Sequence, residues 1–208
     1  MLRSLVGSEM CIRDRYISES STPMIYTGLQ LKKKDPNCEV TFIGPCISKK
    51  LEALEPEVAE VIDFVITYEE LLGMFLAKGI EPSEIKVDDV MMDASETGRY
   101  YAVGGGVAEA VVRRAKEIKP GIEVDVEGAE GLANCVKLAQ MAKLGRMDGK
   151  LIEGMACQGG CVGGPGVVIA DNKTAKAVKA FSKASDFKSP ADNINIPAED
   201  RPDDSKLQ

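Results

Sequence analysis

The order of hydrophobic patterns along the 208-residue chain predicts an α/β fold built from parallel-sheet lobes with flanking helices. Short runs rich in β-branched residues alternate with longer segments whose apolar residues recur at helical spacing, and this alternation is typical of parallel sheets. Glycine and proline follow the short runs and indicate turns at the ends of strands. Apolar residues make up 44% of the sequence, which is enough for a core in one domain or two joined lobes.

The first half of the chain alternates helical and strand patterns. The expected elements are a helix at residues 23–34, strands at 40–43 and 63–66, and a helix that begins after Thr67. Thr67 and Glu70 form the pattern of a capping box, and Gly79 is expected to stop the helix that they start. These assignments place each strand directly before a turn or a helix.

The second half continues the alternation. The expected elements are helices at residues 107–118, 132–144 and 173–184 and strands at 122–126 and 150–153. The glycines at 104–106 suggest a phosphate cradle or a close-packing turn, and the missing Gly-Lys-Ser and dinucleotide patterns favour the turn. The tail from Ser189 is rich in Pro, Asp and Asn and has little to bury.

Charge and histidine content exclude several classes of function. The 33 acidic residues outnumber the 26 basic ones and leave a net charge of -7, which argues against nucleic-acid binding. The sequence has no histidine, so Ser-His-Asp and Cys-His catalysis, histidine-bound zinc and haem with a proximal histidine are excluded. We expect a cytoplasmic protein without a membrane span, because no apolar run reaches the roughly 18 residues that a span requires and the start lacks a signal-peptide core.

Several clusters have simple structural interpretations. The lysines at 32–34 suit the negative end of a helix dipole. Met91 and Met92 are expected in the core. A solvated helix face explains the carboxylates Glu52, Glu55, Glu57 and Glu60.

The six cysteines are expected to be reduced thiols, because the chain has no secretory start. They are Cys11, Cys38, Cys46, Cys135, Cys157 and Cys161. Cys38 has no partner cysteine nearby and is interpreted as incidental. Cys135 lies among apolar residues at helical spacing and is expected to act as a small hydrophobic residue.

Cys46, Cys157 and Cys161 differ from these, because they occur in turns that follow predicted strands. Cys46 lies in residues 44–50 (GPCISKK), and Cys157 and Cys161 lie in residues 155–166 (MACQGGCVGGPG). The carboxyl ends of parallel strands are where open α/β sheets bind ligands. Glycine-rich backbone can donate N–H groups to sulfides, and neighbouring lysines can offset the charge of a cluster, so an iron–sulfur site is favoured over zinc. A reactive dithiol or inert thiols are the alternatives.

The same segments resemble the H-cluster domain of the [FeFe], or iron-only, hydrogenases. Residues 44–50 are similar to the second cysteine motif of the family, and residues 153–164 (EGMACQGGCVGG) are similar to the third. Residues 98–110 and 131–134 (GLAN) resemble further family markers. The resemblance runs from about Ile17 to the C-terminus and implies an iron-only hydrogenase-like fold.

The resemblance implies a metal cofactor and three ligands for it. Cys46, Cys157 and Cys161 would hold a 4Fe-4S cluster, and Cys161 would also bridge to a di-iron subcluster that carries CO, cyanide and a dithiolate. Lys49 would bind a cyanide with its ammonium group, and Met155 would pack against the di-iron unit.

The implied reaction is the reversible reduction of protons to H2. Electrons would come from ferredoxin or upstream iron–sulfur domains, and Ser18 matches a serine of the family's proton path by its spacing from Pro23. Three alternatives remain open at this point: a sensory hydrogenase-like domain, an iron–sulfur assembly factor without the di-iron unit, and an α/β interaction domain without metal.

Two departures from the family pattern shape the expected domain organisation. The first cysteine motif, which supplies the fourth cubane ligand and a proton-relay cysteine, is not present, and residues 1–15 do not resemble the family. We expect a foreign or artefactual segment at 1–15, a partial H-cluster domain at 16–188 and a polar tail at 189–208. The domain is therefore expected to be incomplete at the N-terminus, with an exposed apolar surface and little hydrogen evolution on its own.

The second departure is at Gly44, where well-studied hydrogen-producing members have a methionine. Together with Pro165, late in the third motif, it indicates a divergent subgroup.

Overall fold

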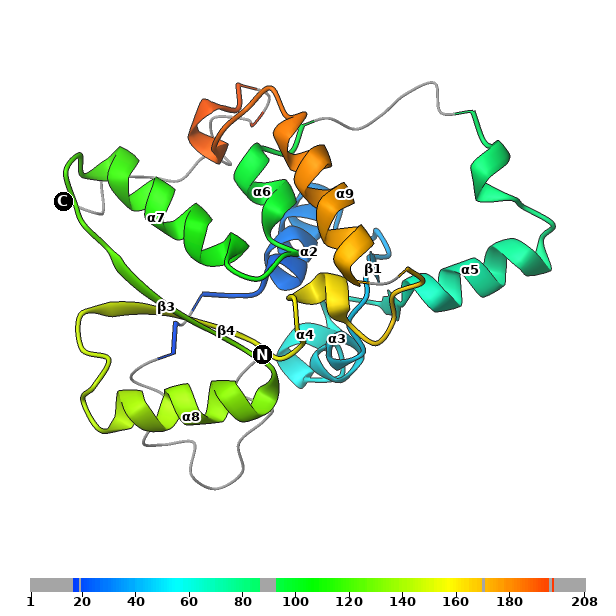
Figure 1. Ribbon diagram of the computed structural model, residues 1–208. Coiled ribbons are helices and arrows are strands. Elements are labelled where there is room, and N and C mark those ends of the chain that lie inside the picture. The colour runs from blue at the N-terminus through cyan, green and yellow to red at the C-terminus, as the bar shows by residue number, and fades with distance from the viewer. Residues whose placement is uncertain (1–16, 19, 87–92, 170, 195, 197–208) are drawn as a thin grey trace. The chain divides into compact units, whose positions relative to one another are not determined.

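The computed structural model (Figure 1) describes residues 17–18, 20–86, 93–169, 171–194 and 196. These residues form two compact units. The first unit comprises the described residues up to Ile85 together with Ala139–Leu144 and Gly164–Val168. The second comprises the described residues of Lys86–Leu138, Gly145–Gly163 and Ile169 onwards. Each unit contains one pair of parallel strands, which confirms the predicted parallel α/β class.

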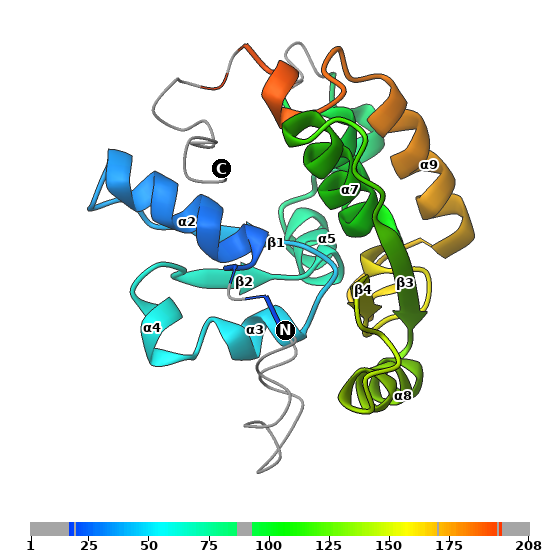
Figure 2. The ribbon, with the colours of Figure 1, turned by 90° about the vertical axis from the view of Figure 1, so that its left-hand side faces the viewer.

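The first unit surrounds the strands β1 and β2. Its elements are α2 (Pro23–Lys34), β1 (Thr41–Ile43), α3 (Ser48–Glu52), α4 (Pro56–Ala59), β2 (Phe64–Ile66), α5 (Tyr68–Ala77) and the 3₁₀ helix η3 (Pro82–Glu84). The strands pair with Thr41 opposite Phe64 and Ile43 opposite Ile66. In Figure 2, α2 lies on one side of the strand pair, and α3 and α4 lie on the other.

The core of this unit lies between α2 and the segment that leads into β2. The buried residues are Met24, Val40, Val58, Val61 and Ile62. Burial of such a side chain contributes about 1.5–3 kcal/mol. A Cβ at Gly28 would lie only 2.7 Å from the Cδ1 atom of Ile62, so glycine allows α2 to approach this core closely.

The predicted capping box at the start of α5 is confirmed. The Glu70 N–H donates to Thr67 Oγ1 (3.2 Å), and the Thr67 N–H donates to the Glu70 carboxylate (2.8 Å). Gly79 follows the helix with a φ of +66°, a conformation that favours glycine. Local sequence signals therefore fix both ends of α5.

The second unit contains the other strand pair. Its elements are α6 (Glu96–Tyr100), α7 (Gly106–Ile118), β3 (Asp125–Glu130), α8 (Leu132–Lys143, whose last residues belong to the first unit), β4 (Lys150–Met155), η4 (Cys161–Gly163), α9 (Asp171–Lys183) and η5 (Pro190–Asp192). β3 and β4 pair in parallel along their full length, from Asp125 opposite Lys150 to Glu130 opposite Met155.

Two expectations for this unit were wrong. The strand expected at residues 122–126 lies at Asp125–Glu130, because pairing with β4 rather than local hydrophobicity determines its position. The tail from Ser189 was expected to bury little, yet Ser189 is 1% exposed and Asn193 is 3% exposed. The Asn193 side-chain amide donates to the Asp93 carbonyl, a contact across 100 positions of sequence.

Some expectations lie outside the described residues. These are Cys11, Met91, Met92 and the foreign segment at 1–15. Within the described part of the chain, no helix combines the length and the apolar character that crossing a membrane requires.

Candidate functional site

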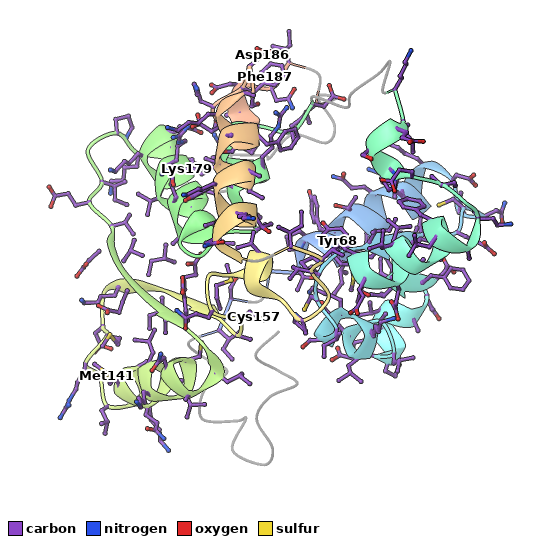
Figure 3. The ribbon with its side chains drawn as sticks, turned by 45° about the vertical axis from the view of Figure 1, so that its right-hand side comes forward. Tyr68, Met141, Cys157, Lys179, Asp186 and Phe187 are labelled. Carbon is purple, nitrogen blue, oxygen red and sulfur yellow. The ribbon has the colours of Figure 1, made fainter. Side chains whose placement is uncertain are left out.

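The turn after β4 holds Cys157, which Figure 3 labels, and Cys161 begins the 3₁₀ helix η4 that follows, as the sequence predicted for both. Both cysteines are half-buried, and Gly159 and Gly160 between them have φ values of +79° and +87°. A Cβ at Gly160 would lie 2.5 Å from the Gly104 backbone nitrogen, so this position accepts only glycine without a backbone shift.

Backbone hydrogen bonds attach this turn to the glycine-rich segment before α7. The Gly104 N–H donates to the Gly159 carbonyl (3.1 Å), and the Val162 N–H donates to the Ala102 carbonyl (3.0 Å). The two segments that the sequence singled out in this unit therefore lie against each other.

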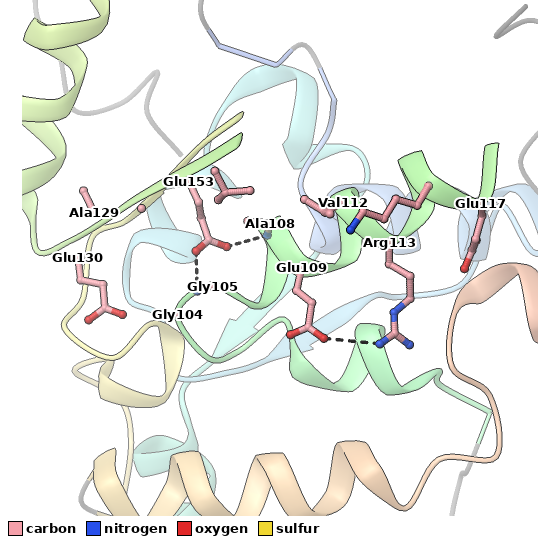
Figure 4. Close-up of a pocket in the computed structure, with 13 residues that line it drawn as sticks. Gly104, Gly105, Ala108, Glu109, Val112, Arg113, Glu117, Ala129, Glu130 and Glu153 are labelled. Atoms are coloured by element: carbon pink, nitrogen blue, oxygen red, sulfur yellow. Dashed lines mark hydrogen bonds and ion pairs between the residues drawn. The ribbon is translucent and has the colours of Figure 1, made fainter. Parts of the chain in front are cut away.

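The glycines at 104–106 form a close-packing turn, as predicted. A Cβ at Gly106 would lie 2.1 Å from the Tyr100 carbonyl oxygen, and Gly105 has a φ of +84°. The Glu153 carboxylate accepts N–H groups from Gly105 (2.6 Å), Val107 and Ala108 (3.0 Å each), as Figure 4 shows in part. A carboxylate of the protein itself thus occupies the anion-binding end of α7, where a phosphate would have to bind.

A pocket of about 880 Å³ lies between α7 and β3 in the same unit (Figure 4). Its apolar part includes Val112, Val126 and Ala129, and its charged part includes Glu109 and Arg113, which are 3.6 Å apart. The residues that line it include no cysteine, but they include Glu130, which accepts the Gly159 N–H in the turn between Cys157 and Cys161.

In the first unit, Cys46 follows β1 at its carboxyl end, as predicted, and is half-buried. The Gly44 N–H donates to the Ile66 carbonyl (3.0 Å) and extends the strand ladder by one bond. A Cβ at Gly44 would lie 2.7 Å from the Phe42 ring. The family's methionine would therefore require Phe42 to move.

Lys49 is buried three residues after Cys46, with 8% of its surface exposed. Its ammonium forms an ion pair with the Glu52 carboxylate, which also accepts the Thr22 hydroxyl (2.7 Å). The expectation that Glu52 belongs to a solvated face was wrong, because Glu52 compensates the buried charge of Lys49. Exposed positions were correctly expected for Glu55, Glu57 and Glu60.

Two further lysines have structural partners that the sequence did not reveal. Lys50 Nζ donates to the Val65 carbonyl (3.0 Å) and pairs with Glu70 (2.9 Å). The Thr67 N–H and then Lys50 lower the pKa of Glu70. Lys32, expected only at a charged helix end, donates to the Asp63 carboxylate (2.9 Å).

The segment Gly164–Val168, which follows the Cys157–Cys161 turn, belongs to the first unit and forms its contacts there. The Gly166 N–H donates to the carbonyl of Pro45 (3.0 Å), the residue before Cys46. The Gly166 carbonyl accepts the Glu69 N–H (3.3 Å), and a Cβ at Gly166 would lie 2.7 Å from the Cβ of Thr67. The chain that leaves the third motif therefore packs beside the second.

The remaining thiols occupy structural positions. Cys38 packs against the first core, and Cys135 is 8% exposed, with its thiol 3.4 Å from the Met155 carbonyl. Burial raises the pKa of the Cys135 thiol, which makes it less reactive. The five described cysteines form no disulfide.

The expected roles of Met155 and Ser18 stay predictions, as do those of Lys49 and the three cysteine ligands. Met155 ends β4 and is half-buried, and Ser18 is exposed and donates to Ser20 (3.0 Å). Inside either unit, the described residues contain no group of three or more Cys, Asp or Glu side chains that could hold a metal ion. The predicted ligand set takes Cys46 from the first unit and the other two cysteines from the second.

Sequence reasoning missed two carboxylates that organise the second unit, Glu130 and Glu153. Glu130 accepts the Gln158 side-chain amide and the Gly159 N–H, both at 2.9 Å. The available signal was an acidic residue next to each glycine-rich motif, in the segments AEGLAN and EGMAC.

The model of the family described as "Iron only hydrogenase large subunit, C-terminal domain" matches residues 13–165. This match covers most of the chain, which therefore belongs to that family. The predicted boundary at residue 15 stays a prediction.

Curated relatives include hydrogenases and assembly factors. The chain is 32% identical to the periplasmic [Fe] hydrogenase large subunit of Nitratidesulfovibrio vulgaris, over 75% of this chain and 47% of that protein. It is 30% identical to iron hydrogenase 1 of Clostridium pasteurianum, over 64% of this chain and 29% of that protein. The cytosolic Fe-S cluster assembly factor narfl of Xenopus tropicalis is 28% identical, over 77% of this chain and 44% of that protein. The chain thus spans less than half the length of these relatives.

Solved structures share the fold. An [FeFe]-hydrogenase structure from work on oxygen inactivation has a TM-score of 0.64 at 20% identity, over 87% of this chain and 64% of that chain. [FeFe]-hydrogenase HydA1 from Chlamydomonas reinhardtii has a TM-score of 0.62 at 20% identity, over 83% of this chain and 63% of that chain. The iron-only hydrogenase fold predicted from the motifs is confirmed.

Proposed function

We propose that this domain binds a 4Fe-4S cluster through Cys46, Cys157 and Cys161, joined to a di-iron unit that reversibly reduces protons to H2. The proposal rests on family membership and on one structural observation. Gly166, five residues after Cys161, donates its N–H to Pro45, directly before Cys46. Both residues belong to the first unit, so the chain that continues from the third motif is held beside the second motif, which supports the proposal.

The described residues fit such a group chemically. The three thiols are half-buried and follow the ends of β1 and β4, and the chain has no histidine to compete for the iron. Thiolates are the usual ligands of iron–sulfur clusters. The glycine-rich turn around Cys157 and Cys161 allows backbone to approach a cluster closely.

The protein would hold and tune the cofactor, which supplies the hydrogen chemistry when it is bound. Lys49 has three N–H donors on its ammonium group, so it can keep Glu52 and still donate to a cyanide. Met155 would contribute an apolar contact that excludes water. We propose a ferredoxin-type carrier as electron donor and a cytoplasmic location.

A second candidate function is iron–sulfur cluster assembly without the di-iron unit. It is favoured by the match to narfl and by a 39% identical segment of 59 residues in the cytosolic Fe-S cluster assembly factor NAR1 of Kluyveromyces lactis. Such a protein would use the same cysteines for a 4Fe-4S cluster.

The first test is anaerobic reconstitution of the 208-residue chain with iron and sulfide. We expect bound iron and sulfide in the wild type, a loss of at least half of the iron in Cys46→Ser, Cys157→Ser and Cys161→Ser, and no loss in the control Cys38→Ser. Equal iron content in all variants would contradict the ligand assignment.

The second test separates the two functions. For this test the domain is expressed within a full-length protein of the family, together with hydrogenase maturation proteins. Infrared bands of CO and cyanide and viologen-dependent H2 production would then support the hydrogenase. A 4Fe-4S cluster without these bands would support the assembly factor.

A further inference from the structure

Glu130 is the last residue of β3 and contacts the turn between Cys157 and Cys161. Its Oε2 atom accepts the Gln158 side-chain amide and the Gly159 N–H, both at 2.9 Å. The side chain is half-buried, and Gly131 with a φ of +81° follows it. This carboxylate therefore reaches the predicted ligand turn from a neighbouring strand.

Gly104 contacts both Glu130 and the same glycine of the turn. A Cβ at Gly104 would lie 2.0 Å from Glu130 Oε1, so the carboxylate packs directly on this glycine. The Gly104 N–H donates to the Gly159 carbonyl (3.1 Å). Both backbone groups of Gly159 are thus fixed, the N–H by Glu130 and the carbonyl by Gly104.

This double attachment has a physical consequence for the two thiols. Glycine loses more backbone entropy on ordering than other residues, and two glycines separate Gln158 from Cys161. Hydrogen bonds to a charged acceptor are stronger than neutral ones and offset part of that cost. Glu130 also takes up the Gly159 N–H, which a cluster sulfide could otherwise accept.

We propose that Glu130 is a positioning residue that orders the Cys157–Cys161 turn, and that its negative charge lowers the reduction potential of the cluster bound there. The inference rests on the proposed function in assuming a cluster on these cysteines. An anion near a cluster disfavours the gain of an electron, and fewer N–H donors to its sulfides act in the same direction.

The ordering role is tested first on the metal-free 208-residue chain. Hydrogen exchange at the Gly159 amide should be at least tenfold faster in Glu130→Ala than in the wild type. Glu127→Gln is the matched control, because Glu127 lies on the same strand and bonds Lys150 (3.2 Å) instead of the turn. Unchanged exchange in folded Glu130→Ala, judged by circular dichroism, would overturn the ordering role.

The electrostatic role is tested on the reconstituted chain by redox titration followed by electron paramagnetic resonance. Glu130→Gln keeps an acceptor for Gly159 but removes the charge, so we expect a retained cluster with a more positive midpoint potential. Glu130→Asp keeps the charge on a shorter side chain, so we expect a lower cluster content at an almost unchanged potential. Glu127→Gln should leave both unchanged.

The outcomes distinguish this inference from the proposed function. A wild-type chain without any cluster would refute the proposed function and the electrostatic role, while the amide exchange still decides the ordering role. If the wild type binds a cluster and Glu130→Gln has the same midpoint potential as the wild type, the electrostatic role alone would be refuted.

Discussion

The Asp63 carboxylate joins three parts of the first unit through two hydrogen bonds. It accepts the Val40 N–H (2.7 Å) at the entrance to β1 and the ammonium of Lys32 (2.9 Å) at the end of α2. The Val40 N–H and then Lys32 lower the pKa of Asp63 in the folded chain. A lowered carboxyl pKa means that the ionised carboxylate is more stable in the folded state than in the unfolded state.

The stability of the first unit should therefore depend on acid pH through Asp63. Its contribution is complete above the unfolded pKa of about 4 and is lost as the pH falls through the lower folded value. We expect Asp63→Asn to lower the urea midpoint at pH 7 and the difference from wild type to shrink towards pH 3. The exposed Glu60→Gln serves as a control; a gap that stays constant with pH would contradict the argument.

Gly44 shows how one residue adapts the second motif to its surroundings. A side chain there would contact the Phe42 ring, which a Cβ would approach to 2.7 Å. We expect Gly44→Met to reduce the free energy of unfolding by about 1–3 kcal/mol, as overpacking does. Adding Phe42→Val should recover part of that loss in a urea-unfolding double-mutant cycle. Purely additive effects would show that the ring is not the obstacle.

At the scale of elements, Glu153 connects β4 to the start of α7. Its carboxylate accepts three backbone N–H groups at the start of α7, those of Gly105, Val107 and Ala108. N–H groups at this end of a helix have no acceptor within the helix. A side chain from another strand thus replaces the usual local N-cap, since the N-cap residue Gly105 has no side chain.

Glu153→Gln should reduce the free energy of unfolding by about 1–2 kcal/mol, because the helix loses an anion at its positive end and some of its hydrogen bonds. Glu109→Gln is the matched control in the first turn of the same helix, where an exposed pair with Arg113 should contribute less than about 0.5 kcal/mol. Chemical denaturation measures both. Equal effects would mean that general helix-end charge, rather than the contacts of Glu153, stabilises α7.

The sequence allowed correct predictions wherever local chemistry decides the structure. The α2 boundaries, the Thr67 capping box and the strand–turn positions of Cys46 and Cys157 all depend on neighbouring residues. Prediction failed where the partner is remote. The sequence of β3 is acidic and contains glycine, and pairing with β4 determines where this strand lies. Arg99 is buried because it donates to the Phe181 carbonyl (3.0 Å) and lies over the Phe181 ring.

The same distinction between local and remote partners applies to the residues of the candidate site. The cysteines and Lys49 could be found from motif and spacing, because their residue types are unusual in those contexts. Glu52 and Glu130 could not, because a glutamate has no distinctive sequence signal and its role is defined by which remote atoms it reaches. Carboxylates that compensate or order a site are visible only in three dimensions.

At the scale of the whole molecule, the chain must bring motifs from both units to one cofactor if the proposed function holds. The hydrogen bond from Gly166 to Pro45 links the segment after the third motif to the second. Glycine is required at this position, because a Cβ would lie 2.7 Å from Thr67 and 3.1 Å from the Pro45 carbonyl oxygen.

We therefore expect Gly166→Ala to lower iron incorporation by at least half although no ligand is changed, and to reduce the free energy of unfolding by about 1–3 kcal/mol. Gly128→Ala is the matched control, because a Cβ there meets no atom within 4 Å. Iron and sulfide analysis after anaerobic reconstitution, with urea unfolding of the metal-free chain, measures both effects. If Gly166→Ala takes up as much iron as Gly128→Ala, the contact with Pro45 does not organise the cofactor site, and the cysteines alone must bring the two motifs together.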